Sequence, residues 1–287
     1  MMDKERCRRC RIGWLVGCLL LLVGCTTELA YNTLPFWSHY YLDDIIHLTP
    51  TQSRHVKADL DAIQQWHRTH ELPRLAEQLG LLAAQSTEHQ TWDQLRDHQT
   101  AFKARLQATL NEMVPATTRL LQSLDDRQAE RLTQFLKEEI EDAQARRDEE
   151  SPQSWLSDQE EELEERTERW VGHTQDSQMP FYVEMAEYQQ RAMPTFIKVR
   201  EQLQARLFGL IENRQQDDLD TQLYQWVDDL VAWRGGKGTQ TDMAIYRSRR
   251  LDWLLRLDKS LNDDQRLHLM EELQEWESRL QEMAEQK

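Results

Sequence analysis

The sequence predicts an all-α fold, an irregular bundle of about nine amphipathic helices. Apolar residues recur at spacings of three and four, as in the series Leu219, Leu223, Trp226, Leu230 and Trp233. Glycine and proline are scarce, with 9 and 7 among 287 residues, and strand-like alternation is nearly absent. A lone helix cannot bury an apolar stripe in water, so these helices must pack on one another.

The stripes and the breaks between them place the helices along the chain. The run from Gly235 to Gly238 is the clearest loop, and the last helix should break near Ser260. We expect helices over 29–46, 50–70, 73–85, 90–113, 125–149, 158–171, 181–213, 217–234 and 242–286.

Prolines mark the expected helix starts, where a missing N–H group costs no intrahelical hydrogen bond. Pro194 instead falls inside a continuous apolar stripe, so it should kink its helix rather than end it. The six prolines that we place near helix starts are Pro35, Pro50, Pro73, Pro115, Pro152 and Pro180.

A short pattern, Leu followed four residues later by Gln, with apolar residues four and eight positions after that Gln, occurs three times and predicts three well-formed helix starts. It spans 48–52, 124–128 and 261–265. Thr49, Asp125 and Asn262 are good N-cap residues, and a Gln three residues later can reach back to the N–H of the cap. The pattern therefore predicts capping boxes that begin at these three residues.

The N-terminus has the three zones of a secretion signal. Five basic residues lie within residues 1–11, and residues 12–24 are apolar without a charge. This apolar run is about 13 residues, whereas a spanning helix needs roughly 20. We therefore predict a signal peptide over 1–24 rather than a membrane-spanning anchor.

The end of the signal, Leu22-Val23-Gly24-Cys25, resembles the lipobox of bacterial lipoproteins. That resemblance implies cleavage before Cys25, lipidation of its sulfur and lasting attachment to a membrane. An ordinary signal followed by a stray cysteine is the alternative. Leu15-Val16-Gly17-Cys18 has the same letters, but too few apolar residues precede it. Thr26 stands where an Asp would resemble an inner-membrane retention signal, so we expect the outer membrane, with the body on its periplasmic face.

Composition limits the chemistry of the mature chain. Cys7, Cys10 and Cys18 would leave with the signal, so a disulfide or a cysteine metal site could not form. Of the 35 basic and 51 acidic residues, the body from 25 to 287 keeps 30 and 49, a net charge of −19. Such a surface repels nucleic acid and could attract cationic partners.

No catalytic constellation stands out, and we predict no enzyme activity, no cofactor and no metal site. Seven of the nine histidines fall in the first 98 residues, and His67 and His70 stand beside Glu71 at a spacing that metal ligands can have. A third ligand cannot be assigned, so surface and helix-end histidines are the simpler interpretation. These histidines could make the N-terminal half sensitive to mild acid. The run Gly235–Thr239 lacks the leading glycine and the strand of a phosphate loop.

Two resemblances bear on function. Leu48-Thr49-Pro50-Thr51-Gln52 resembles the LTxxQ motif of periplasmic helical chaperones of the Spy and CpxP type, over about 15 residues. The lipobox, Leu29-Ala30-Tyr31-Asn32, Tyr41-Leu42-Asp43, the segment 48–52 and the segment 66–74 are similar to an uncharacterised family of proteobacterial lipoproteins. The second resemblance implies a location but no site residues.

These features divide the chain into a signal peptide (1–24), a lipidated N-terminus with the first helix (25–48) and a helical periplasmic body (49–287). A subdivision of the body near 146–152 is possible, where the chain is polar and helix-ending. The aromatic stretch 26–46 is expected to be a core helix, with a position at the membrane interface as the alternative.

We therefore expect an outer-membrane-anchored lipoprotein that acts as an interaction or structural protein of the cell envelope. Its partners would be the membrane, through Cys25, and an envelope protein or peptide. A chaperone of the LTxxQ kind is the first alternative, and a metal-dependent enzyme is the second.

Overall fold

The computed structural model describes residues 25–236 and 238–286, and the side chains of Cys25, Thr26 and Asp148 lie outside this description. The predicted all-α fold, an irregular helical bundle, is confirmed over these residues. The predicted signal peptide, 1–24, lies outside them.

The helices are α2 (Cys25–Ile46), α3 (Pro50–Trp66), α4 (Leu72–Gln85), α5 (Trp92–Ser123), α6 (Asp126–Asp148), α7 (Pro152–Val171), α8 (Met179–Glu212), α9 (Leu219–Val231), α10 (Gln240–Ser260) and α11 (Asp263–Glu285).

The chain divides after Gln64 into two compact units. The described part of the first unit consists of α2 and most of α3. Between them, His39 Nε2 lies 2.7 Å from Ser53 Oγ, and the Tyr31 hydroxyl donates to the Gln64 carbonyl at 3.4 Å. The predicted subdivision near 146–152 falls between α6 and α7, within the second unit, and stays a prediction.

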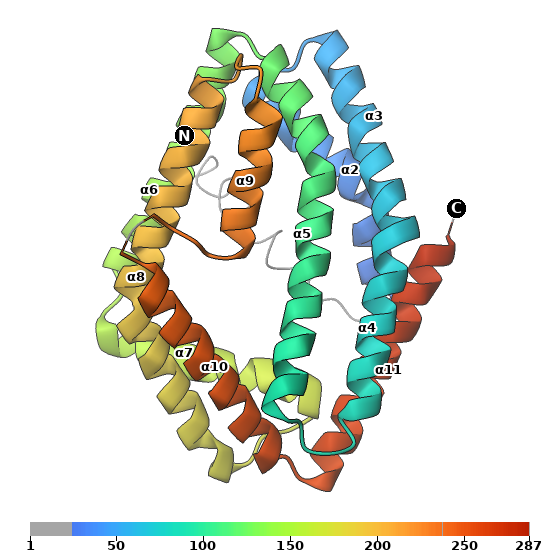
Figure 1. Ribbon diagram of the computed structural model, residues 1–287, viewed down its shortest axis with the longest axis vertical. Helices are drawn as coiled ribbons and strands as arrows, with labels where there is room; N and C mark the ends of the chain where they lie inside the picture. The colour runs from blue at the N-terminus through green and yellow to red at the C-terminus, as the bar shows by residue number, and fades with distance from the viewer. Residues whose placement is uncertain (1–24, 237, 287) are drawn as a thin grey trace, which may run out of the picture. The chain divides into compact units, whose positions relative to one another are not determined.

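In the second unit, neighbours in space are often far apart in sequence. Figure 1 shows α4 alongside α11 and α5 beside α9. Helix α8 packs against α7, α9 and α10, and α11 also contacts α7. The C-terminal helix therefore lies against elements from the first third and the middle of the chain.

Helix α8 carries the buried apolar residues that join its neighbours. Near its start, Tyr182 and Met185 pack with Leu163 of α7 and Trp253 of α10. Trp253 also donates from its indole N–H to the Phe181 carbonyl at 2.7 Å, which satisfies the polar atom of a buried ring. Further along α8, Val199 and Leu203 pack against Met243 of α10.

An ion pair at the edge of this core also joins α8 to α10. Arg256 donates two hydrogen bonds to the Glu184 carboxylate, at 2.7 and 3.0 Å. These hydrogen bonds lower the pKa of Glu184 below its ordinary value, because they stabilise the charged form.

The three predicted capping boxes are all present. Thr49 and Gln52 exchange hydrogen bonds at 2.9 and 3.3 Å, and reciprocal bonds join Asp125 with Gln128 and Asn262 with Gln265. The helix break predicted near Ser260 is likewise confirmed, because α10 ends there. A fourth box, Thr91 with Gln94, starts α5, and its Thr-x-x-Gln spacing was visible in the sequence.

The placement of prolines is only partly confirmed. Pro50 and Pro152 begin their helices, and Pro73 and Pro180 lie in a first turn. The prediction is wrong for Pro35 and Pro115, which lie inside α2 and α5, whereas α8 does continue through Pro194 as expected. At Pro35 the structure shows the compensation. The ring removes the hydrogen bond to the Tyr31 carbonyl four residues earlier, and Gln64 of α3 donates to that carbonyl instead.

The sequence predicts two separate helices, 50–70 and 73–85. In the structure the chain stays helical from residue 50 to residue 85 and does not break before Pro73. A π-helical turn, η1 (His67–Glu71), connects α3 to α4, and the Leu72 N–H donates to the His67 carbonyl five residues earlier. This turn takes up an extra residue, so the helix continues past the proline. It also buries Arg68, which donates to the Met283 carbonyl at 3.2 Å near the end of α11. Because the last carbonyls of a helix have no intrahelical partner, Arg68 caps α11.

Candidate functional site

Cys25 is the first residue of α2, but its side chain lies outside the described residues, so its lipidation stays a prediction. Along the helix that follows, Leu29, Phe36 and Tyr40 are separated by seven and four residues and share one face. Phe36 is 64% exposed and the adjacent Trp37 is 47% exposed, whereas Tyr31 on the opposite face is buried. The expectation of a core helix is therefore wrong for this face.

The exposed rings of α2 contact one another. The ring centroids of Phe36 and Trp37 lie 5.2 Å apart, and those of Trp37 and Tyr40 lie 6.0 Å apart, both edge to face. We name Leu29, Phe36, Trp37 and Tyr40 the α2 aromatic face. Within the described residues no helix is long and apolar enough to cross a membrane.

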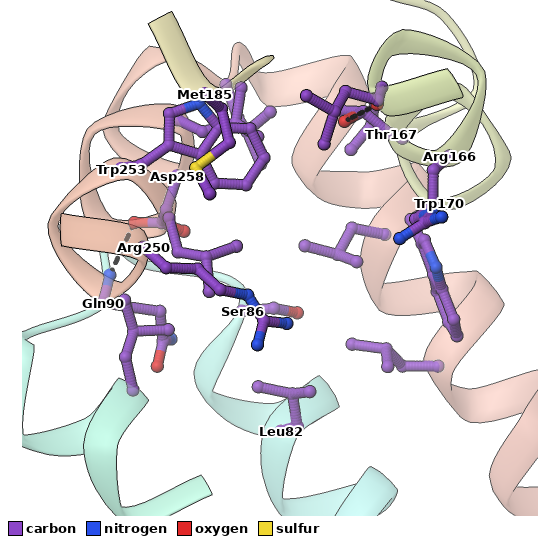
Figure 2. Close-up of a pocket in the computed structure, with 18 of the residues that line it drawn as sticks. Leu82, Ser86, Gln90, Arg166, Thr167, Trp170, Met185, Arg250, Trp253 and Asp258 are labelled. Carbon is purple, nitrogen blue, oxygen red and sulfur yellow. Dashed lines mark hydrogen bonds between the residues drawn. The ribbon is translucent and has the colours of Figure 1, made fainter. Parts of the chain in front are cut away.

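A cavity of about 580 Å³ lies within the second unit, between α4, α7, α8, α10 and α11. Figure 2 shows Trp253 and Met185 on one side of it, Trp170 on the other and Leu82 at the edge formed by α4. Its walls are mainly leucine and tryptophan side chains. Its size is typical of small-molecule sites, and polar side chains, among them Thr167, Gln189 and Tyr246, line it as well.

Two arginines approach the cavity from opposite walls. In Figure 2, Arg250 extends from α10 across the opening toward Ser86, and Arg166 projects from α7. Arg166 pairs with Glu162, one turn earlier on the exposed side of α7. Arg250 makes no hydrogen bond or ion pair with any residue that the structure describes.

Tyr246 also lines the cavity, and the charges of Arg250 and Arg166 both affect the pKa of its hydroxyl. Burial raises the pKa of its hydroxyl above the ordinary value, and the positive charges of Arg250 and Arg166 oppose that rise. A nearby cation favours the phenolate, so both charges lower the pKa of Tyr246 against the effect of burial.

A buried ion pair closes the cavity beside Ser86 and Gln90. Asp258 accepts from Arg266 Nη1 at 3.2 Å and from the Gln90 N–H at 2.8 Å. Arg266 also donates to the carbonyls of Ser86, at 3.2 Å, and Glu88, at 3.0 Å. Both side chains are about one-tenth exposed. The pair thereby fixes the connection between α4 and α5 to the turn between α10 and α11.

A second polar cluster joins the same turn to the connection between α7 and α8. The Gln265 amide donates to the His173 carbonyl at 2.7 Å and to Gln178 Oε1 at 3.0 Å. Gln178 donates in turn to Ser260 Oγ at 3.1 Å. Both glutamines are fully buried. Gln265 therefore caps α11 and also bonds to a distant segment, which the capping pattern alone did not predict.

The histidine cluster does not come together as a metal site. His70 stacks on Trp66, and the buried Glu71 carboxylate pairs with Arg74 at 3.0 Å and lies 3.7 Å from Arg105. Burial lowers the pKa of His67 below its ordinary value, against the opposing effect of Glu71. No group of three or more His, Cys, Asp or Glu suited to a metal occurs among the described residues.

His98 is the histidine most closely tied to the fold. Its Nδ1 lies 2.6 Å from the Gln78 amide nitrogen and its Nε2 lies 2.9 Å from Gln85 Oε1. The neutral ring with its proton on Nε2 satisfies both contacts, since the amide donates to Nδ1 and Nε2 donates to the oxygen. Burial lowers the pKa of His98, and Asp97 partly opposes that shift.

The glycine-rich loop is confirmed as a loop between α9 and α10. The Gly236 N–H donates to Gln202 Oε1 at 2.6 Å, so this amide is satisfied within the chain. Sequence reasoning did not single out Arg166, Arg250, Asp258 or Arg266. Each lies on a helix rich in other charged residues, and none belongs to a recognisable motif.

The comparison with protein families gives one match. The model of the family of unknown function DUF6279 matches residues 44–233, more than half of the chain. No curated protein and no solved structure matches. The matched region includes α4, α7 and α8 of the cavity wall, whereas α10 and α11 follow it. Membership of a family of unknown function is thereby confirmed, whereas the resemblances to proteobacterial lipoproteins and to the LTxxQ chaperones stay predictions.

Replacing Arg266 tests the buried ion pair. Arg266→Gln should lower the free energy of unfolding by about 3–5 kcal/mol, because Asp258 would stay buried without its charge partner. Arg96→Gln is the control. Arg96 pairs with Asp93 on an exposed surface, where a change of about 0–1 kcal/mol is expected. Urea unfolding monitored by circular dichroism measures both. Equal losses of unfolding free energy for the two variants would contradict a stabilising role for the buried pair of Asp258 and Arg266.

The pH dependence of stability tests His98. Its pKa is lower in the folded state than in the unfolded chain, so the unfolded state binds a proton first as the pH falls through about 6.5. Stability should therefore decrease from pH 7 toward pH 5. His98→Gln should reduce that decrease to the part that His67 contributes, whereas His55→Gln, at an exposed position of α3, should retain it in full. Unfolding midpoints of the wild type and both variants, measured at several pH values, test this prediction. If both variants show the same dependence of the midpoint on pH, His98 does not cause the loss of stability in acid.

Proposed function

Because the chain belongs to the family of unknown function DUF6279, we propose its function from its own residues: an outer-membrane-anchored periplasmic lipoprotein that acts as an interaction or structural protein of the cell envelope. The observation that carries the proposal is the α2 aromatic face, which follows directly after the lipobox cysteine. An exposed cluster of aromatic rings is unusual on a surface that faces only water. It is typical of a segment that lies at a membrane interface.

The anchor and the α2 aromatic face support one another. Thirteen apolar residues are too few to span a membrane, so retention would depend on acyl chains at Cys25. Trp and Tyr favour the headgroup level of a bilayer, where one edge of the ring is wet and the other is apolar. Helix α2 would then lie along the membrane surface and leave the second unit for a partner in the periplasm.

Lipidation is the first prediction. The intact mass of the protein from native membranes should correspond to a chain that begins at residue 25 and carries a diacylglyceryl group. Cys25→Ser should abolish that mass and release the protein from the outer membrane fraction. Cys18→Ser is the matched control and should leave mass and location unchanged. An unmodified thiol at Cys25, or an uncleaved leader, would contradict the proposal.

Photo-crosslinking in intact cells tests the two surfaces. A photoreactive phenylalanine analogue in place of Phe36 should form adducts with lipid, because that side chain would reach the bilayer. The same analogue in place of Tyr31, buried on the opposite face, should crosslink only within the chain. Protein adducts at position 36, without lipid adducts, would overturn the membrane assignment of this face.

A partner should be captured from the second unit. Ile245 and Leu267 are 55% and 51% exposed, on α10 and α11. The photoreactive analogue at these positions should give discrete adducts with one or a few envelope proteins, and Cys25→Ser should weaken them. The absence of any protein adduct from both positions would argue against an interaction role.

The α2 aromatic face also favours a second candidate, a chaperone of the LTxxQ kind. Exposed apolar rings could hold an unfolded client, and the LTxxQ-like segment lies just after this helix. The full lipidated chain should then suppress aggregation of a reduced, unfolding model protein, and Phe36→Ser should reduce the effect. No suppression at molar excess would remove this candidate.

A further inference from the structure

The cavity in the second unit combines apolar walls with two exposed arginines, Arg166 and Arg250. Leu82, Leu163, Trp170, Leu254 and Leu269 come from α4, α7, α10 and α11 and offer aliphatic and aromatic surface. Side chains of the described residues leave a space of about 580 Å³ between them. A ligand with an apolar body of that size would displace water from these walls.

Charge sets the chemistry at the polar end of that space. Asp258 is the acidic residue among those that line the cavity, and it is neutralised by Arg266 and bonded to the Gln90 N–H. Arg250 has no counter-ion among the described residues, and Arg166 is paired only at the exposed side of α7. Both arginines are exposed, so the positive charge lies at the solvent-facing side of the cavity rather than in its interior.

The two arginines border the same cavity from two different helices. Figure 2 shows their side chains directed into the same space from α7 and α10. A guanidinium presents several N–H donors in a planar fork that matches carboxylate and phosphate oxygens. A cationic or uncharged head would leave Arg250 without a partner.

We propose that this cavity binds a single-chain anionic amphiphile, with its carboxylate or phosphate head at Arg250 and Arg166 and its alkyl chain against the leucine and tryptophan walls. The site goes beyond the proposed function and does not depend on lipidation of Cys25. Fatty acids and lysophospholipid-type phosphates share this chemistry, and competition between probes distinguishes them.

Photolabelling of the full chain, purified from native membranes and placed in nanodiscs, tests the proposal. The probe is a dodecanoic acid that carries a diazirine on its alkyl chain. Mass spectrometry should locate the label on peptides of α7 and α10. Dodecanoate and dodecyl phosphate should compete, and the stronger competitor identifies the head group. Dodecanol should not compete, because it has the same chain without the charge. Equal competition by dodecanol, or labels confined to α2, would overturn the site.

Variants separate the charge from general damage to the fold. Arg250→Gln should reduce cavity labelling about tenfold, as expected for loss of a hydrogen bond to a charged group. Arg249→Gln is the matched control, since Arg249 is the adjacent residue but packs over the Tyr188 ring outside the cavity. It should label like the wild type. If Arg250→Gln does not retain the wild-type melting temperature, Arg166→Gln provides the same test. Equal labelling of a folded arginine variant and the control would refute the proposal.

Discussion

The buried pair of Asp258 and Arg266 is the interaction on which the second unit most depends. Burying two charges is expensive unless each finds enough partners, and this pair finds them in the backbone of a distant connection. Arg266 bonds to the carbonyls of Ser86 and Glu88, and Asp258 bonds to the Gln90 N–H. If the connection between α4 and α5 moved away, two charges and several backbone groups would lose partners together. The pair therefore requires one arrangement of these segments.

The same principle applies at other helix ends. Arg214 donates to the Leu124 carbonyl and pairs with Asp126, which ties the end of α5 and the start of α6 to the segment after α8. Arg68 caps α11 from the π-helical turn, and Gln265 joins its own cap to the segment before α8. Helices held at their ends do not need side chains to fill the space along their length.

The sequence predicts what depends on neighbouring residues. Capping boxes need only residues three apart, so Thr49, Asp125 and Asn262 were placed correctly, as was the break at Ser260. Pro35 was misplaced because its tolerance inside α2 depends on Gln64, a residue of another helix. Arg266 and Ser86 are 180 residues apart, so no local pattern reveals their contact. The cavity is formed by such distant contacts and could not be predicted.

The charge balance of the chain makes the position of Arg250 informative. With 51 acidic and 35 basic residues, an arginine on a helix surface readily finds a carboxylate, and Arg96, Arg191 and Arg279 each pair with one that is three or four residues away. Arg127, Arg146, Arg169 and Arg200 also make no hydrogen bond or ion pair with any residue that the structure describes, so Arg250 differs from them only in lining the cavity. Arg250 is exposed and extends from α10 over the cavity, among whose lining residues Asp258 is the acidic one. Its charge is thus available to an anion that enters the cavity, and the acidic surface around it would favour a ligand whose single negative group is carried by an apolar chain.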